Sequence, residues 1–449
     1  MDCVPAVCNG YPSFELGYEE EGKMIKKLSV IIYWAIMIAL LALFFTNDFG
    51  LTDIRKTSII VAVGVDTQDG EVQVTAQLAV PQPSESGNNI QYTQVQGSGL
   101  TVADALNEIN SKTGFYPKLL FCKLILIGEE CQKDELFKIL SCFYRRNYSE
   151  LTALVAMCQG KAGDMLAMPA TVNPETSSAI LQVLSDELEK SANVSYANLK
   201  DIAETNFSKS AACYMPYIEA NKPGTSESGG GDSIGGDPAE GSGGSSGGSE
   251  GGSGGSSGGS SGGSQGGGSS SQSSDTGGGE EQVEFTARRT AFFSDGKFAG
   301  ILDETQSFAL DIIKNNIRLA VLPFNVDDVH YTLGMKNAKG DVKLKVNKGV
   351  PELTISFKAK AQIQGKRMTL DPKDVPFDDI VKQNVLEGAK KEIETRFSDL
   401  VKTCAETDCD LLGARNLLYK FNTKYFDAFN GDLLTRMKVK YEINIQSVN

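Results

Sequence analysis

Residues that carry out chemistry are scarce in this chain of 449 residues. It has one histidine, His330, and one tryptophan. A single imidazole excludes a zinc site made of several histidines and weakens any interpretation as an enzyme with a histidine base. His330 lies in a strand-like pattern, where structural roles are more common than catalytic ones. The chain also lacks a GxxxxGK[ST] phosphate loop, and its GxG patterns fall in a Gly/Ser tract, where composition alone produces them.

Acidic residues give no clearer sign of catalysis. Glu129 and Glu130 are neighbours in the sequence, and so are Asp378 and Asp379. A glycosidase needs two carboxylates that flank a sugar from separate elements, and one sequence does not show that geometry. Solvated acids are the simpler interpretation. We therefore predict no catalytic residues, no cofactor and no metal site, so the chain is not expected to be an enzyme.

Positive charge is in short supply as well. The chain has 43 Lys and Arg residues against 57 Asp and Glu residues, which gives a formal net charge of −14. Nucleic acids and anionic lipid headgroups both attract basic patches, so this balance argues against either of them as a partner. Solubility is the simplest role for the excess negative charge.

The nine cysteines are scattered, their number is odd, and no CxxC motif occurs. An exported domain held by disulfides would usually pair its cysteines in a tighter framework. Four of them lie in apolar surroundings between positions 122 and 158, where cysteine behaves as a small buried hydrophobe. A bridge between Cys404 and Cys409 remains an open alternative.

One long apolar run is present. Leu28 to Phe45 contains no charged residue and follows Lys23, Lys26 and Lys27. As a helix it would be roughly 27 Å long, close to the thickness of a bilayer's hydrocarbon core. We predict a transmembrane anchor over residues 28–46, after a short N-terminal tail at 1–27. The anchor positions are Leu28, Ile32, Trp34, Ile38, Leu41 and Phe45.

The charges that flank the run indicate its orientation. More lysines precede it than basic residues follow it at Arg55 and Lys56, so most of the chain is expected outside the cytoplasm. A cleaved signal peptide is less favoured, because its apolar region would be about 7–15 residues long and would end in a small-residue site. A lipoprotein would need a cysteine just past the run, and none lies between Cys8 and Cys122. Translation from Met24 is an alternative start.

Hydrophobic patterns after the anchor predict an α+β fold with two or three mixed α/β-sheet domains. Residues 52–170 combine a hairpin, with a turn signal at Asp66 to Gly70, and alternating strands and helices, which indicates a first α/β domain on a mixed sheet. Thr101 and Asp104 form a capping box ahead of an amphipathic helix there. Residues 171–314 are expected to form a small second domain. Pro216 indicates an edge strand in it, because proline cannot donate a ladder hydrogen bond.

The second domain is interrupted by residues 224–280, which are mostly Gly and Ser. This tract lacks apolar side chains that could offset the entropy cost of ordering, so we predict that it is disordered. A hinge between domains is one interpretation. We favour another, in which the strands before and after the tract pair in one sheet and the tract is a long inserted hairpin loop. Such an insertion is tolerable because the entropy cost of loop closure grows slowly with length.

Residues 315–449 predict a C-terminal α+β domain. Four strand-like segments are Arg318 to Phe324, Val329 to Leu333, Asp341 to Val346 and Pro351 to Ile363. They are followed by the strongest amphipathic helix of the chain, Phe377 to Cys404, whose apolar residues recur at helical spacing. A second helix follows, and Met437 to Ile445 alternates as a closing strand. The apolar stripe of the long helix is interpreted as core, with a partner surface as the second option.

Several of these segments together resemble a known family. The C-terminal order of long helix, second helix and closing strand is part of the resemblance. The other matching segments are Asp53-Ile-Arg55, Ile59-Ile-Val-Ala-Val-Gly64-Val-Asp66, Leu124-Ile-Leu-Ile-Gly128-Glu-Glu130, Gly160-Lys-Ala162 and the most specific one, Thr290 to Thr305. On these residues the chain resembles the Ger(x)C family, the C-subunit-type proteins of nutrient germinant receptors in spore-forming bacteria. The resemblance covers about residues 52–222 and 283–449.

Three features depart from the family pattern. Family members are typically lipoproteins, and the lipid-attachment cysteine is absent here, so the helix itself would be the anchor. The aromatic-rich segment before the last strand is reduced to Tyr425, Phe426 and Phe429. The Gly/Ser tract is additional.

The resemblance implies a non-enzymatic, membrane-anchored subunit of a nutrient germinant receptor, needed for spore germination and located on the outer face of the spore inner membrane. It implies A-type and B-type receptor subunits as partners, with the small-molecule germinant acting through those subunits. Two alternatives remain: a membrane-tethered envelope hydrolase, which convergent carboxylates in a deep cleft would favour, and a generic anchored solute-binding or adhesion protein.

Overall fold

The structure of the chain is a computed structural model. Two of the anchor positions, Leu28 and Phe45, lie outside the described residues, and so does the tract at 224–280 that was predicted to be disordered. The described residues are 30–42, 57–84, 87–114, 116–145, 149–173, 175–185, 194–222, 282–314, 316–368 and 381–448.

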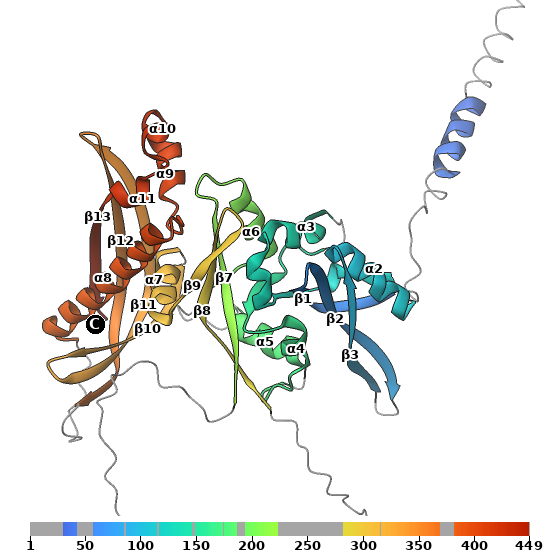
Figure 1. The fold of residues 1–449 in the computed structure, drawn as a ribbon, viewed down its shortest axis with the longest axis horizontal. Coiled ribbons are helices and arrows are strands. Elements are labelled where there is room, and N and C mark those ends of the chain that lie inside the picture. Colours follow the sequence, from blue (N-terminus) through green and yellow to red (C-terminus); the bar gives the residue numbers. More distant parts are fainter. Residues whose placement is uncertain are drawn as a thin grey trace, which may run out of the picture. The chain divides into compact units, whose positions relative to one another are not determined.

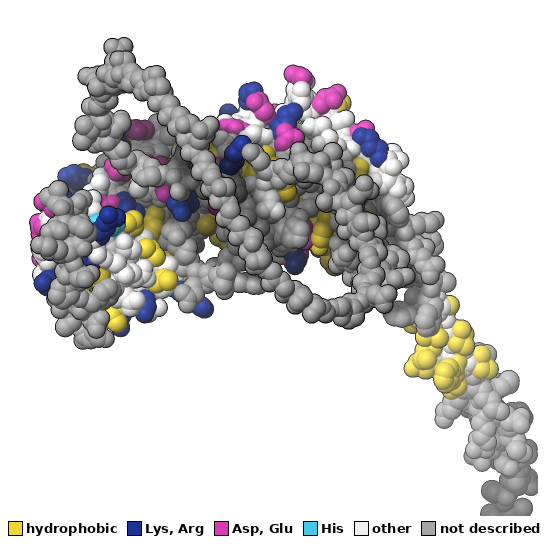
Figure 2. Space-filling model, turned by 90° about the horizontal axis from the view of Figure 1, so that it is seen from below, with side chains coloured by type: hydrophobic (Ala, Val, Ile, Leu, Met, Phe, Trp, Pro, Cys, Tyr) yellow, Lys and Arg dark blue, Asp and Glu magenta, His cyan; other side chains and the backbone are white. Residues whose placement is uncertain are grey.

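The chain divides into two compact units, Met1–Thr57 and Ser58–Asn449. The first contains a helix over residues 30–42 (Figure 1). Every side chain of this helix is exposed, and Figure 2 shows hydrophobic side chains clustered on it. Among the helices that the structure describes, none combines the length and the apolar character that a bilayer crossing requires.

A nine-stranded mixed sheet runs through the first part of the larger unit (Figure 1). β1 turns at Asp69 and Gly70, both with positive φ, into the antiparallel β2, as the hairpin pattern predicted. β1, β5 and β6 are parallel, so their carboxyl ends lie at the same edge. The strands in spatial order are β3 (Gly87–Gly99), β2 (Glu71–Ser84), β1 (Thr57–Gln68), β5 (Leu124–Ile127), β6 (Leu154–Cys158), β7 (Ala212–Asn221), β8 (Glu284–Ser294) and β9 (Lys297–Leu302), and β4 (Tyr116–Lys118) pairs with β1.

Helices cover both faces of this sheet. Along β5, Ile125 and Ile127 belong to one hydrophobic core, and Leu124 and Leu126 belong to the other. A strand that is buried on both faces carries such a continuous apolar run. On the first face lie α2 (Val102–Thr113), α3 (Leu136–Arg145) and α6 (Leu199–Asn206), and on the second lie α4 (Ala162–Ala167) and α5 (Thr176–Leu184). Two short 3₁₀ turns are η2 (Leu119–Phe121) and η3 (Glu129–Lys133).

Thr101 is the N-cap of α2, as the predicted capping box requires. The Thr101 hydroxyl oxygen accepts the Asp104 N–H at 3.2 Å, and the Thr101 hydroxyl donates to the Asp104 carboxylate at 2.8 Å. The helix ends at Gly114 with φ 68°, a conformation that glycine adopts without strain.

The two strands that flank the Gly/Ser tract pair with each other, as predicted. Asn221 of β7 lies opposite Glu284 of β8 in an antiparallel ladder. The sheet also continues across the division expected near residue 170, because β6 pairs with β7. The domain bounds 52–170, 171–314 and 315–449 stay a prediction.

The prediction that the strand around Pro216 lies at a sheet edge is wrong. β7 has β6 on one side and β8 on the other. Its ladder with β6 consists of Tyr217 and Ile218, which follow the proline. The start of β6 is bonded elsewhere, since the Val155 N–H donates to the Ala197 carbonyl at 3.0 Å. An interior strand thus accommodates proline at a position where the neighbouring ladder has not yet begun.

The C-terminal part holds a four-stranded sheet with helices on one face. Phe397 of α8 packs edge-on against Phe357 of β12, with 6.1 Å between ring centroids. The first three strands are antiparallel in sequence, and β13 is parallel to β12. In spatial order they are β10 (Asn316–Val326), β11 (Val329–Asn347), β12 (Val350–Met368) and β13 (Lys438–Ser447). The other elements are α7 (Glu304–Lys314), α8 (Gln383–Glu406), α9 (Ala414–Phe421), η4 (Thr423–Tyr425), α10 (Phe426–Phe429) and α11 (Leu433–Arg436).

Two strands predicted in this sheet are in fact one. The segments expected at 329–333 and 341–346 belong to the continuous β11, which contains an irregularity between Lys336 and Lys339. Asn337 adopts φ 52° at that point, so a local bulge replaces the break that the sequence indicated. The predicted mixed sheets are confirmed, and so is the long helix with its apolar face toward the core, although it begins at Gln383 and not at Phe377.

Candidate functional site

Three aspartates are almost completely buried in the described part of the chain. Asp66, Asp311 and Asp410 have exposed fractions of 3%, 0% and 1%. A buried carboxyl group must be hydrogen-bonded or neutralised, and perturbed groups of this kind cluster at functional sites. The hydrogen-bond partners of these three aspartates therefore bear on the function of the chain.

Asp66 ties the end of β1 to the start of α4. Its two carboxylate oxygens accept the backbone N–H groups of Ala162 and Gly163 at 2.7 and 2.9 Å. Burial raises the pKa of Asp66, and these two hydrogen bonds oppose the shift because they favour the ionised form. The carboxylate thus fixes the loop after β6 against β1.

Glycines allow the close approach around this carboxylate. A Cβ on Gly128, which follows β5, would overlap the Asp66 Oδ1 atom. A Cβ on Gly64 would lie 3.0 Å from the backbone of Ala162. Gly64, Asp66, Gly128 and Ala162 all belong to segments that carry the family resemblance, and the fold brings those segments together at one sheet edge.

The adjacent acids Glu129 and Glu130 do not form a catalytic pair. Glu129 accepts the Gly160 N–H at 3.1 Å and donates its own N–H to the Gly160 carbonyl at 2.8 Å, which ties the loops after β5 and β6 together. Glu130 is exposed and pairs with Lys133 at 2.6 Å. The other adjacent pair, Asp378 and Asp379, lies outside the described residues.

Asp311 lies on α7 in a small polar cluster. Its Oδ1 atom accepts the Ser195 hydroxyl at 2.9 Å, and Ser195 lies 2.7 Å from the hydroxyl of Thr290 on β8. Its Oδ2 atom has no hydrogen-bond partner among the described residues. Burial raises the pKa of Asp311 well above its usual range, so the neutral acid is the favoured form.

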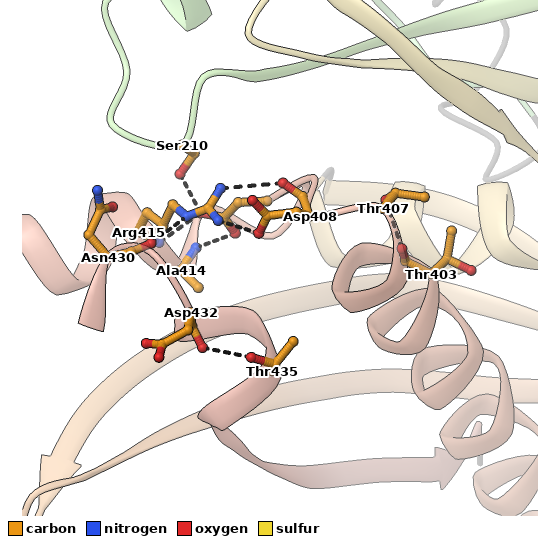
Figure 3. A network of polar contacts seen from close by, with 10 residues as sticks. Ser210, Thr403, Thr407, Asp408, Ala414, Arg415, Asn430, Asp432 and Thr435 are labelled. Atoms are coloured by element: carbon orange, nitrogen blue, oxygen red, sulfur yellow. Dashed lines mark hydrogen bonds and ion pairs between the residues drawn. The ribbon is translucent and has the colours of Figure 1, made fainter. Parts of the chain in front are cut away.

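Asp410 joins the turn before β7 to the start of α9. Its carboxylate accepts the Ser210 hydroxyl at 2.6 Å and the N–H groups of Ala414 and Arg415 at 2.8 and 2.7 Å. The Arg415 guanidinium pairs with Asp408 (Figure 3). Burial raises the pKa of Asp410. Its hydrogen bonds oppose this rise, and the bond from Ser210 opposes it most. The network connects the two sheets.

None of these aspartates lines any of three surface hollows that the described residues form. These three have volumes of about 1090, 700 and 280 Å³. The largest lies beside α3 and is bordered by Leu100, Phe137 and Phe298 together with basic side chains such as Lys138. The described residues also contain no group of three or more His, Cys, Asp or Glu side chains that could hold a metal ion. The arrangement that would favour a hydrolase, convergent buried carboxylates in a cleft, is not found among them.

The residues singled out in the sequence lie in separate places. His330 of β11 is half-buried, and its Nδ1 atom lies 2.8 Å from the amide oxygen of Asn325. The anchor positions that the structure describes stand on the helix at 30–42, and all are exposed: Ile32, Trp34, Ile38 and Leu41.

Cys404 and Cys409 are free thiols, so the open alternative of a bridge between them is not realised here. The Cys409 N–H donates to the Cys404 carbonyl at 3.1 Å. Burial raises the pKa of Cys404 to about 12, which disfavours the reactive thiolate.

Comparison with known proteins gives a consistent result. The family model described as "Spore germination protein N-terminal domain" matches residues 51–220, and that described as "Spore germination B3/GerAC like, C-terminal" matches residues 288–448. The crystal structure of the GerBC protein is similar, with a TM-score of 0.46 and 13% identity, over 86% of this chain and 97% of that one. No curated protein matches the chain.

The chain is a two-sheet α+β protein in which buried, hydrogen-bonded aspartates hold separate elements together. The chain belongs to the Ger(x)C, or GerAC-like, family of spore germination proteins, as the sequence resemblance predicted. That family has a role in spore germination, and membership indicates association with a membrane and with other receptor subunits. The two matched ranges leave out residues 221–287, where the Gly/Ser tract lies.

Proposed function

We propose that this chain is a non-enzymatic, membrane-anchored subunit of a nutrient germinant receptor. The observation that carries the proposal is the match of both family models, one on each side of the Gly/Ser tract. A-type and B-type subunits are its partners in this proposal, and the small-molecule germinant acts through them.

The use of the buried acids supports a role without catalysis. A catalytic acid or base must come within hydrogen-bond reach of a substrate. The Asp66 and Asp410 carboxylates are instead bonded to backbone N–H groups at the starts of α4 and α9. These hydrogen bonds hold the elements of the larger unit together, which suits a subunit that acts through contacts with its partners.

The apolar run over residues 28–46 supports the anchor. It replaces the attachment that a lipid-modified cysteine provides in typical family members. The lysines before the run favour an orientation with most of the chain on the outer face of the spore inner membrane.

Deletion and complementation test the proposal. In a strain without a paralogue, we expect spores that lack this gene to lose nutrient-triggered germination, and a wild-type copy to restore it. Spore yield and heat resistance serve as controls and should not change. Normal germination of the deletion strain would overturn the receptor role.

Affinity purification of the full chain from detergent-solubilised spore membranes tests the partners separately. The A-type and multi-span B-type subunits encoded beside it should be recovered together with it. Their absence from a preparation that retains the chain would contradict the partner assignment.

A further inference from the structure

The four-stranded sheet has a second face, opposite its helices, that is rich in lysine. Along β12, Leu353, Ile355 and Phe357 are buried in the core, and the alternate side chains point the other way. The registers of β11 and β13 place their partner residues on that same side. We call this surface the lysine face. Its charged residues are Lys336, Lys339, Lys343, Lys345, Lys358, Lys360, Lys438, Lys440, Asp341, Glu352 and Glu442.

Positive charge is concentrated on this face in a chain that is acidic as a whole. All eight lysines are exposed. Three acidic side chains lie on the same face, so it has an excess of five positive charges. The whole chain carries a formal net charge of −14. The expectation that this balance disfavours anionic lipid surfaces treated the charge as evenly spread, and the fold separates it.

The arrangement of the lysines is unfavourable for the isolated sheet. Lys336 lies directly opposite Lys360, and Lys339 lies directly opposite Lys358. Like charges at directly opposed positions destabilise a strand pair. An anionic partner in front of the face would offset this repulsion.

A hollow of about 700 Å³ lies on the face and offers groups that bind anionic oxygen atoms. It is lined by Lys339, Lys343 and Lys358 and by the polar residues Ser356 and Asn444, and the Ser356 hydroxyl donates to Glu442 at 3.3 Å. Two of the three acidic residues also border it, and one of them, Asp341, already pairs with Lys343 at 2.8 Å. Lysine is the most frequent residue type around the hollow.

The composition of the face distinguishes a lipid surface from a protein partner. Between Glu352 and Lys360 of β12, and at the paired positions of β11 and β13, the face has neither arginine nor an aromatic side chain, and Arg367 lies farther along β12, opposite His330. Protein interfaces are enriched in Arg, Tyr and Trp and depleted in Lys. A broad array of lysines is instead what attracts anionic headgroups at a membrane surface.

We propose that the lysine face binds the anionic headgroups of the membrane to which the chain is attached. The proposal rests on the proposed function only for the presence of that membrane. Binding through the face would hold the C-terminal sheet on the bilayer, in addition to the anchor at the other end of the chain.

Lysine acetylation of the full chain in lipid nanodiscs tests this proposal. Nanodiscs of phosphatidylcholine alone are compared with nanodiscs that also contain anionic phosphatidylglycerol, and the modification rate of each lysine is read by mass spectrometry. We expect the face lysines to react at least about threefold more slowly in anionic nanodiscs at low salt, and to lose this protection at high salt. Lys200 and Lys402 are controls, because they are about as exposed as Lys343, at 63% and 73% against 66%, and each also pairs with an acid.

A matched pair of variants sharpens the test. In the quadruple variant K339Q/K343Q/K358Q/K440Q, the remaining face lysines should react equally fast in both kinds of nanodisc. The control K200Q/K391Q/K402Q/K420Q removes the same charge elsewhere and should keep the protection. Equal reactivity of the wild-type face in both lipids, or protection that does not depend on lipid charge, as a protein contact would give, overturns the proposal. Co-elution of the chain with the nanodiscs at high salt reports on the anchor, so a failure of the proposed function is recognised separately.

Discussion

The two sheets of this protein are covered in different ways. The nine-stranded sheet has helices on both faces, and its buried carboxylate, Asp66, is bonded within the chain to the start of α4. The four-stranded sheet has helices on one face only and presents lysines on the other. The buried carboxylate of the first sheet therefore contributes to the stability of the chain, whereas the exposed lysines of the second sheet are accessible to a partner.

Glycine substitutions should give the largest difference in stability between the two sheets. G128A places a methyl group where the Asp66 carboxylate lies and displaces its hydrogen bonds to α4, so we expect a loss of about 2–4 kcal/mol in the free energy of unfolding. In the second sheet, a Cβ on Gly365 would meet only ordinary contacts at 3.6 Å, so G365A should change stability by less than about 1 kcal/mol. Urea unfolding of the full chain in detergent measures both. Equal losses in the two variants would contradict the difference.

The buried acid Asp311 should make stability fall with rising pH. Its pKa is raised in the folded state, so above the usual value of 3.8 the folded chain holds a proton that the unfolded chain releases. D311N removes this effect. Relative to the wild type, the variant should gain stability as pH increases above about 4, by up to about 1.4 kcal/mol per pH unit until the folded pKa is passed. Urea midpoints measured across the pH range check this, and a constant difference would show that the Asp311 pKa is not raised.

The smallest effect is expected on the lysine face. K358E turns the directly opposed pair with Lys339 from like to opposite charges, so stability should rise by about 0.5 kcal/mol at low salt. High salt should remove most of the gain. A thermal unfolding series over salt concentration measures it. A destabilised variant would show that repulsion between Lys339 and Lys358 is not significant.

Local patterns in the sequence predicted the local structure well. The capping box at Thr101, the turn at Gly70 and the pairing of the strands around the Gly/Ser tract all depend on neighbouring residues or on a single ladder. Pro216 was misinterpreted because the rule for proline in strands concerns one hydrogen bond, and whether a neighbour is present at that position depends on how the sheet is assembled.

The hydrogen bonds of the buried aspartates and the lysine face could not be predicted in the same way. Asp311 stands among the apolar residues of α7, and Asp410 precedes the helix start at Ala414. Both features are visible in the sequence. Their partners Ser195 and Ser210 are far away in the sequence. The alternating lysines of β11, β12 and β13 are visible in the sequence, but only the strand register places them on one face.

The anchor is the claim on which the account depends most, and extraction of membranes tests it most directly. Membranes from cells that express the full chain are washed with high salt and alkaline buffer, which removes proteins held by charge. We predict that the chain remains in the membrane and is released only by detergent, and that a variant with lysine at Ile38 and Leu41 is released by the wash. Recovery of the intact wild-type chain in the soluble cytosolic fraction, after gentle lysis without detergent, would contradict the account.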